Sequence, residues 1–285
     1  MAALIAFASV GALLIQPTVA SAQSSMIDNI LNNALPSSNT NDDNQPSQAS
    51  DSNNSSSSAI PLSTSLSCGQ VIKQSVKLTA NLDCKTDGII VGADSITIDL
   101  NGFTLSGPGE KSSKVGVMFA DNDGVTVQGP GTIQNFQAGA LFSGGEDNKI
   151  SRVTFTENEI AVFETGSKNV AIEDNLMFGN SIGVAAHSSS GSKLTTNLFK
   201  SNELAGVTLV NSASNELSMN TIQGSVNGIF LDGQSTKNSV DSNNVLQNRG
   251  VDLNNGNGLP TNINDNVFTD NNCNTSVPDG LCLGR

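Results

Sequence analysis

The chain has 285 residues and a net charge of −13 at neutral pH, with one histidine, no tryptophan and no tyrosine. This acidic balance argues against nucleic acid as a partner, because phosphate backbones are bound by basic surfaces. It also disfavours an anionic polysaccharide as ligand unless cations mediate, although acidity is equally a common solubility device on an extracellular surface.

Residues 1–22 are predicted to be a signal peptide. The apolar stretch Ala2–Ile15 is followed by Ala20-Ser21-Ala22, a small-x-small cleavage site. The stretch is too short for a comfortable membrane span. No Lys or Arg precedes it, so a start upstream of Met1 or an uncleaved anchor is the alternative. We expect a secreted, extracellular or cell-surface protein whose mature chain has no transmembrane domain.

Residues 23–60 are rich in Ser, Asn, Asp and Gln, which predicts a disordered linker. One exception is the segment Met26–Leu35, in which the apolar residues fall on one helical face. A helix of ten residues is marginal alone. A transient helix without a role is therefore favoured over a docking element.

A repeated line occupies the second half of the chain. It follows the pattern Asn-x-Φ-x-x-Asn, in which Φ is apolar, and successive copies begin 22 or 23 residues apart. The six copies are VTFTEN (153–158), NLMFGN (175–180), NLFKSN (197–202), NTIQGS (220–225), NNVLQN (243–248) and NVFTDN (266–271). Self-similarity at a fixed period is typical of stacked-repeat proteins.

Two further apolar columns share this period. A Gly-Φ-x-Φ element recurs near residues 116, 139, 160, 183, 206, 228 and 250. The other column contains Val125, Ile150, Ala171, Leu194, Leu217, Val240 and Ile263. Each period thus holds three short strands separated by turn residues, with no room for a helix.

This pattern predicts an all-β fold, a right-handed parallel β-helix that forms a single-stranded solenoid of about eight coils of 21–23 residues. A leucine-rich repeat is disfavoured by the Gly-, Ser- and Asn-rich turns. The expected domains are an N-terminal cap (61–87), the β-helix coils (88–272) and a C-terminal disulfide cap (273–285). Equivalent residues should stack, giving an internal column of Phe119, Phe142, Phe163, Ala186, Leu209, Leu231 and Leu253.

The region from Ser67 onward resembles the secreted right-handed parallel β-helix proteins of the pectate-lyase-like superfamily. Within that group it is most similar to the repeats of NosD-type proteins and carbohydrate-acting CASH domains, and the segment Cys68–Gly109 resembles their N-terminal cap and first coil. The resemblance implies the fold. It does not imply one activity, because this superfamily includes lyases, hydrolases, epimerases, adhesins and proteins without a known reaction.

Four cysteines form two local pairs in the sequence. Three pairings are formally possible. In a stack of coils, Cys68 and Cys84 lie at one end and Cys273 and Cys282 at the other, so that only the local pairing is geometrically sensible. We expect two disulfides, one closing each end of the solenoid, with metal binding by these cysteines as the lesser alternative.

Candidate catalytic residues are few. A uronate lyase needs carboxylates that hold Ca²⁺ and a base beside them. Arg152 shares a column with Asp174, followed by Thr196, Met219, Ser242 and Asp265. This arrangement makes Arg152 a candidate base beside an acidic cation site, but a surface ion pair between coils is the favoured interpretation.

Metal-ligand signals are weak as well. An oxygen-rich turn around Asp121 and Asp123 is followed by Glu146, Asp147 and Glu164 in what we interpret as equivalent turns. These oxygen ligands make calcium a possible ligand. We expect no other cofactor. Copper needs several converging soft ligands. The candidates are His187, Met118, Met177 and Met219. Exposed aromatic rings for sugar binding are limited to Phe136 and Phe178.

The sequence therefore favours a monomeric secreted or cell-surface β-helix with a structural or binding role toward a polysaccharide or another surface component. The first alternative is a Ca²⁺-dependent polysaccharide lyase or epimerase acting on uronate polymers. The second alternative is a surface adhesin or self-assembling envelope protein.

Overall fold

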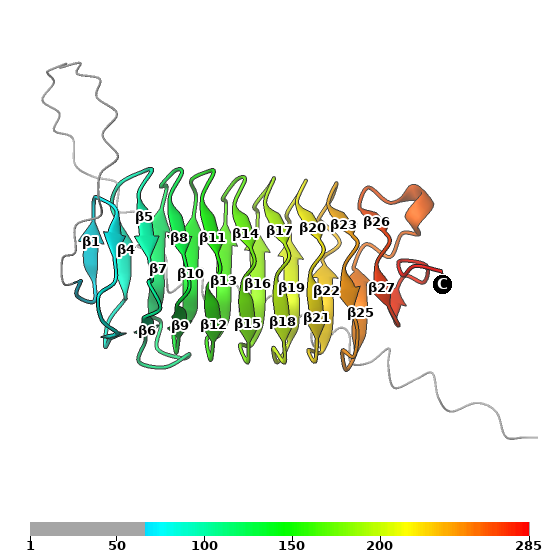
Figure 1. The fold of residues 1–285 in the computed structure, drawn as a ribbon. Coiled ribbons are helices and arrows are strands. Elements are labelled where there is room, and N and C mark those ends of the chain that lie inside the picture. Colours follow the sequence, from blue (N-terminus) through cyan, green and yellow to red (C-terminus); the bar gives the residue numbers. More distant parts are fainter. Residues whose placement is uncertain (1–65, 285) are drawn as a thin grey trace, which may run out of the picture.

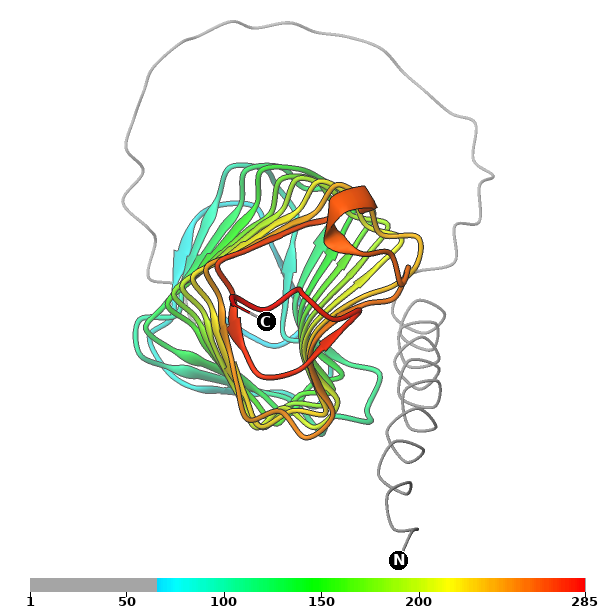
Figure 2. The ribbon, with the colours of Figure 1, turned by 90° about the vertical axis from the view of Figure 1, so that its right-hand side faces the viewer.

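The computed structural model describes residues 66–284, and this part of the chain winds into a column of short parallel strands (Figure 1). Three parallel sheets form the sides of the column. Seen along its axis, successive coils superpose as one layer of ribbon around the core (Figure 2). The predicted right-handed parallel β-helix is confirmed, with about nine turns instead of about eight.

The three sheets contain every strand of the described region. The first sheet consists of β1 (Gln70–Ile72), β4 (Ile89–Val91), β7 (Val115–Ala120), β10 (Ala138–Ser143), β13 (Ile160–Thr165), β16 (Ile182–His187), β19 (Ala205–Val210), β22 (Asn227–Leu231), β25 (Val251–Asn255) and β28 (Ser276–Val277). The second consists of β2 (Val76–Lys77), β5 (Thr97–Asp99), β8 (Thr126–Gln128), β11 (Lys149–Ser151), β14 (Ala171–Glu173), β17 (Lys193–Thr195), β20 (Glu216–Ser218), β23 (Ser239–Asp241) and β26 (Val267–Thr269). The third consists of β3 (Leu82–Asp83), β6 (Thr104–Ser106), β9 (Thr132–Gln134), β12 (Thr154–Thr156), β15 (Leu176–Phe178), β18 (Leu198–Lys200), β21 (Thr221–Gln223), β24 (Asn244–Val245) and β27 (Asn272–Cys273).

The expected N-terminal cap, residues 61–87, carries in its described part the first strand of each sheet. The single helical element of the described residues is the short 3₁₀ helix η1 (Thr261–Ile263). No helix within 66–284 is long and apolar enough to span a membrane. The predicted signal peptide, the Ser/Asn-rich linker and the segment 26–35 lie outside the described residues.

The internal column of the first sheet differs from the prediction at two positions. The rings of Phe119 and Phe142 stack with centroids 4.2 Å apart. The next member, however, is Glu164, because the coil is 22 residues long and Phe163 is one residue short of the register. The column then continues through Ala186, Leu209 and Leu231, as predicted, and ends on Asn255 in place of Leu253.

The internal column of the second sheet is also partly corrected. It consists of Ile98, Val127, Ile150, Ile172, Leu194, Leu217, Val240 and Phe268. The predicted members Val125, Ala171 and Ile263 are therefore wrong. Val127, Ile172 and Phe268 occupy these positions, two, one and five residues further along the chain. Turn lengths differ between coils, and the sequence pattern does not reveal where each extra residue is placed.

Asparagine side chains connect the coils at the bends. Before the third sheet, buried Asn175, Asn197, Asn220, Asn243 and Asn271 form one ladder. Each amide oxygen accepts the backbone N–H of the ladder residue one coil earlier, as Asn197 Oδ1 does from Asn175 at 3.0 Å. The same amide donates to a backbone carbonyl of the previous coil, as Asn197 Nδ2 does to Ile172 at 2.7 Å. The bends thus satisfy buried polar backbone groups that no strand pairs.

A second ladder precedes the first sheet, and a third precedes the second sheet. The second contains Asn158, Asn180, Asn202 and Asn248, and Ser225 stands between the last two with a buried hydroxyl group that has no hydrogen-bond partner. The third contains Asn148, Ser192, Asn215, Asn238 and Asn266, with Val170 in the position between Asn148 and Ser192. The predicted placement of asparagine at the bends is confirmed, since each of the six repeat lines has an asparagine in a ladder.

The sixth line, NVFTDN, lies one sheet away from the other five. Its Val267 pairs with Ser239 of the second sheet, and Asn266 and Asn271 belong to two different ladders. The last coil is longer, since 28 residues separate Asn243 from Asn271 where 23 separate Asn220 from Asn243. The segment around η1 accounts for the extra length, so sequence similarity alone misplaces this line.

The two predicted disulfides are confirmed. Cys68 is bonded to Cys84 and Cys273 to Cys282, with Cα atoms 5.5 and 5.2 Å apart. Each closes one end of the solenoid, where an open coil would otherwise expose core and strand edges. Such bonds persist in an oxidising compartment outside the cytoplasm.

We expect Asn197→Ala to lower the free energy of unfolding by about 2–4 kcal/mol, because it leaves the buried Asn175 N–H and Ile172 C=O without partners. Urea unfolding followed by far-ultraviolet circular dichroism measures the change. The matched control is Asn244→Ala on the exposed face of β24, for which we expect less than about 0.5 kcal/mol. Equal losses in both variants would contradict a stabilising role for the ladder.

Candidate functional site

The candidate base and its acidic neighbour lie in one turn column, as predicted. Arg152 and Asp174 both have left-handed backbone conformations, and their N–H groups donate to the Glu173 and Thr195 carbonyls of the next coil. No ion pair joins them among the salt bridges of residues 66–284. Asp174 Oδ1 instead accepts a hydrogen bond from Thr196 Oγ1 at 2.5 Å. The favoured ion-pair interpretation is therefore wrong.

The same column continues through Thr196, Met219 and Ser242, as expected, but its last member is Asp270 and not Asp265. The Ser242 N–H donates to the Thr269 carbonyl, which precedes Asp270. No second cation stands beside Arg152 in this column. A catalytic role for Arg152 and Asp174 stays a prediction.

The four calcium candidates lie in the turns between the first and second sheets. Asp123 Oδ1 accepts the Glu146 N–H at 2.8 Å, and Asp147 Oδ1 accepts a hydrogen bond from Asn169 Nδ2 at 3.1 Å. Asp121 occupies a left-handed turn position. Within residues 66–284, no three His, Cys, Asp or Glu side chains come together in a group that could hold a metal ion. The observed contacts connect one coil to the next.

The soft copper ligands do not converge. Met177 is buried in the interior, Met118 packs on the outer face of the first sheet, and Met219 is exposed in a turn. His187 ends β16. The three methionines therefore lie in three separate places, and His187 carries a buried Nδ1 without a hydrogen-bond partner.

Glu164 is the chemically unusual residue of the interior. The prediction that it lies in an acidic turn is wrong: it occupies β13 and is fully buried in the core column. Its Oε2 accepts a hydrogen bond from Ser192 Oγ at 2.7 Å, and its Oε1 has no partner. Burial raises the pKa of Glu164 to about 7, and the Ser192 hydrogen bond opposes that shift.

The space for this carboxyl group comes from an interruption of the ladder before the second sheet. Ser192 stands where most coils carry asparagine, and Val170 precedes it in the ladder. A serine side chain is smaller than an asparagine side chain, so it occupies less of the space beside Glu164, and its hydroxyl group donates to the carboxyl group. One other carboxyl group, that of Glu159, has a pKa raised by burial.

The outer face of the second sheet is charged. At three places a lysine pairs with a carboxylate of the next coil: Lys77–Asp99 at 3.1 Å, Lys149–Glu173 at 2.6 Å and Lys193–Glu216 at 3.7 Å. These partly exposed pairs contribute about 0–1 kcal/mol each. They neutralise one another and leave no cluster of one sign on this face.

The outer face of the third sheet has a different composition. Most of its outward positions are Thr, Ser or Gln, and parallel pairing stacks them in two columns. One column contains Thr104, Thr132, Thr154, Leu176, Leu198 and Thr221, and the other contains Ser106, Gln134, Thr156, Phe178, Lys200 and Gln223. A small apolar area formed by Leu176, Phe178 and Leu198 therefore lies between hydroxyl-bearing coils.

We call this area the β15–β18 platform. Phe178 is 46% exposed and Leu198 38% exposed. Of the two aromatic residues predicted to face outward, Phe178 does so, whereas Phe136 is buried at the bend and meets Gly107 and Gly116. Sequence reasoning treated Phe178 as isolated. The missed signal is that Leu176 and Leu198 are apolar at outward positions of the repeat line, where the flanking copies carry Thr.

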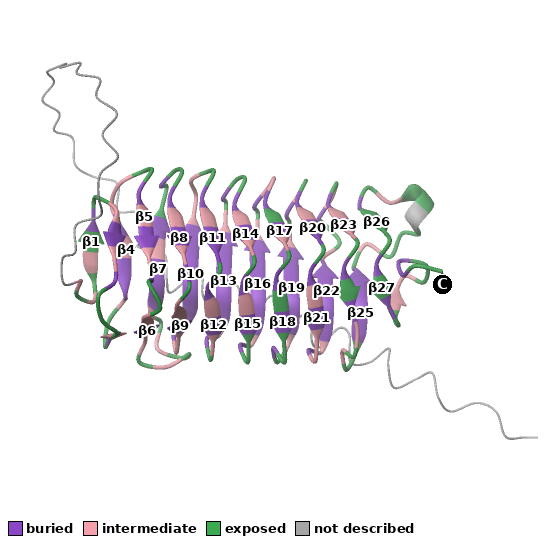
Figure 3. Ribbon diagram, viewed as in Figure 1, coloured by how far each residue is buried: buried purple, intermediate pink, exposed green. Residues whose placement is uncertain are grey.

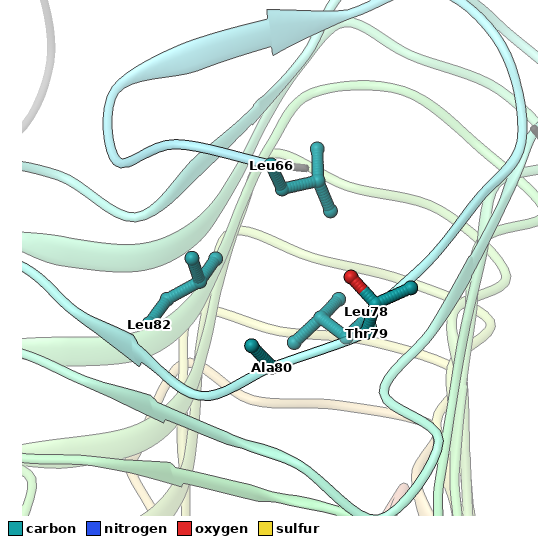
Figure 4. A pocket seen from close by; sticks show the side chains of 5 residues that line it. All are labelled: Leu66, Leu78, Thr79, Ala80 and Leu82. Atoms are coloured by element: carbon teal, nitrogen blue, oxygen red, sulfur yellow. The ribbon is translucent and has the colours of Figure 1, made fainter. Parts of the chain in front are cut away.

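The described cavities lie at the ends of the column. A small one of about 50 Å³ is lined by Leu66, Leu78, Thr79, Ala80 and Leu82 at the first coil (Figure 4). Another, lined by Asn274, Thr275, Ser276, Asp279, Gly280 and Cys282, lies at the last coil. Figure 4 shows side chains that are mostly apolar around the first cavity, which fits an end of the core better than a polar active site.

Comparisons with known proteins agree with this architecture. Residues 80–280 match the family described as periplasmic copper-binding protein (NosD), which is more than two thirds of the chain. The chain belongs to the NosD family. No curated protein matches its sequence.

Solved structures share the fold of this NosD-family chain at low identity. The Dettilon tailspike protein gp208 is 16% identical with a TM-score of 0.51, covering 67% of this chain and 43% of its own. DFA-IIIase from Arthrobacter chlorophenolicus A6 without its lid is 14% identical with a TM-score of 0.52, covering 76% and 60%. The same enzyme in complex with GF2 is 15% identical with a TM-score of 0.51, covering 66% and 51%. The chain spans about half the length of these proteins, and the likeness shows the fold alone.

The buried carboxyl group gives a pH-dependence prediction. Between pH 4.5 and about 7 the folded chain keeps a proton on Glu164 that the unfolded chain releases. The free energy of unfolding should therefore fall as pH rises through this window, by on the order of 3 kcal/mol in total. Glu164→Gln should remove this component and be more stable than the original chain above pH 7.

Urea midpoints measured between pH 4 and pH 8 test this expectation. The control is Glu173→Gln, which alters a partly exposed carboxylate in an ion pair and should keep the wild-type fall in stability. An unchanged pH slope in Glu164→Gln would show that the carboxyl group does not carry the effect.

Proposed function

We propose that this NosD-family protein binds carbohydrate along the outer face of its third sheet without turning it over, with the β15–β18 platform as the main contact. The observation that carries the proposal is exposed Phe178 beside Leu198, set among outward Thr and Gln side chains. A pyranose ring presents apolar C–H faces and a hydroxyl edge. An exposed aromatic ring can cover the former while neighbouring hydroxyl and amide groups bond the latter.

The regular spacing supports a polymeric ligand. Coils of a parallel sheet repeat every ~4.8 Å, so the same donors and acceptors recur along the column axis. A chain molecule lying along that axis would meet hydroxyl or amide groups at most coils and the apolar platform between them. The net charge of −13 favours a neutral polymer over a polyuronate, since like charges would repel.

Export to the outside or the cell surface is part of the proposal. It is supported by the two disulfides and by the predicted cleavage after residue 22. The mature protein is proposed to act as a monomer. The copper of the family description is not included, because the three described Met side chains lie in three separate places.

We expect Phe178→Ala to weaken binding to a neutral polysaccharide roughly tenfold, through loss of the apolar surface under the sugar ring. A glycan array identifies the ligand, and affinity electrophoresis against it measures the change. The matched control is Val267→Ala, which removes a similarly exposed apolar side chain from the second sheet and should leave affinity unchanged. Equal weakening in both variants, or no binding to any glycan, would overturn the proposal.

A second assay addresses the lyase or epimerase alternative, in which Ca²⁺ would bind near Arg152 and Asp174. The chain is incubated with Ca²⁺ and a panel of polyuronates, and unsaturated product is followed by ultraviolet absorbance. We expect no product. Product that disappears in Arg152→Ala would replace the binding proposal with a catalytic one.

A further inference from the structure

The outer face of the first sheet carries an apolar cluster separate from the core. Outer faces of solenoid sheets normally meet water and are polar, as the second and third sheets are. Here eight outward residues of β7 to β19 are aliphatic or aromatic and at most 1% exposed, Met118 beside them is partly buried, and Figure 3 shows the long strands of this sheet mostly in the buried colour. The cluster includes Val115, Leu141, Ile160, Phe163, Ile182 and Ala185.

Register makes this cluster a continuous strip, which we call the outer apolar strip. One column runs through Met118, Leu141, Phe163 and Ala185, and a parallel one through Val115, Ala138, Ile160, Ile182 and Ala205. The strip ends where the columns change to Thr208 and Asn227. At the spacing of paired strands, four or five coils extend over roughly 15–20 Å.

No strand or helix of residues 66–284 lies over the outer apolar strip, although the loop before β7 approaches its edge, where Glu110 and Lys111 lie near Glu159. The end-on view shows a single layer of ribbon around the core, without a second layer of residues 66–284 over a sheet (Figure 2). An apolar surface of this size, nearly free of solvent exposure, requires a covering partner. The described chain begins at Leu66, beside the first coil, so the preceding residues are tethered at one end of the column, two coils before the strip begins at β7.

We propose that the segment Met26–Leu35 binds along the outer apolar strip as an amphipathic helix. Its six apolar residues fall on one helical face, and Asn and Asp occupy the other. Ten helical residues are about 15 Å long, close to the length of the strip. The strip also supplies the tertiary contacts without which a helix this short is marginal.

The tether between the two parts is long enough. Thirty residues, 36–65, separate the segment from Leu66. A flexible polar chain of that length has a root-mean-square span of about 30 Å, which reaches the middle coils from the first one. The only comparably apolar stretch before Leu66, Ala2–Ile15, belongs to the predicted signal peptide and would be absent from the mature protein.

Disulfide trapping tests the contact in the full chain. We expect Leu31→Cys combined with Ala185→Cys to form an intramolecular disulfide upon mild oxidation, at least about fivefold more than the matched pair Leu31→Cys with Thr154→Cys. Thr154 lies on the outer face of the third sheet. Peptide mapping under non-reducing conditions measures the yield. Equal yields, or a bond formed only between two chains in a concentration-dependent way, would overturn the proposal.

A charge substitution gives a second readout that leaves residues 66–284 intact. Ile30→Asp with Leu31→Asp should release the strip and raise fluorescence of the apolar dye ANS severalfold. Asn29→Asp with Asn32→Asp adds the same charge on the polar helical face and should leave it unchanged. Far-ultraviolet circular dichroism verifies that the solenoid is folded in both variants. Dye binding that is identical in the two variants would contradict the proposed contact.

Discussion

Each bend between two sheets places a backbone N–H inside the column where no neighbouring strand can pair it, and stacked side-chain amides supply the missing acceptor. Asn175, Asn197 and Asn220 show the rule, because each amide oxygen accepts from the coil before it and each amide nitrogen donates to a carbonyl of that coil. An uncompensated buried polar group costs about 1–3 kcal/mol. Coincidence of the ladder residues therefore stabilises the observed register of the coils.

The ladders also explain where the interior departs from a simple repeat. A coil that carries Ser192 in place of asparagine has a shorter side chain at the bend, and Glu164 of another coil uses its hydroxyl as a partner. The resulting buried carboxyl group stands in a column that otherwise holds Phe142 and Ala186. A single substitution in a ladder thus changes the chemistry of the neighbouring core position.

Because the interior side chains stack on one another, function depends on the side chains of the three outer faces. The second sheet presents ion pairs that neutralise one another, and the third presents hydroxyl groups around the exposed ring of Phe178. The first sheet presents an apolar strip that is not exposed. Three surfaces of distinct polarity on one rigid column suit a protein that binds a polymer on one face and part of its own chain on another.

Much of the architecture follows from the sequence. Period, polarity and turn chemistry are local properties, so they determine the parallel β-helix, the asparagine bends and the local disulfides Cys68–Cys84 and Cys273–Cys282. Register across coils is not local. Coils differ by one residue or more, and a one-residue slip moves a side chain to the opposite face of a strand. This slip put Phe163 inside and Glu164 outside in the sequence-based prediction, and the extra residues around η1 shifted NVFTDN to another sheet.

The candidate sites divide in the same way. The sequence by itself identified the shared column of Arg152 and Asp174, but only the tertiary structure showed that Asp174 bonds to Thr196. The sequence likewise contained Leu176, Phe178 and Leu198 without revealing that they share one exposed face between threonines. Composition and period determined the parallel β-helix architecture. Which side chains meet, and on which face, was decided by the stacking of coils, because contacts between residues about 22 positions apart depend on the exact length of every turn between them.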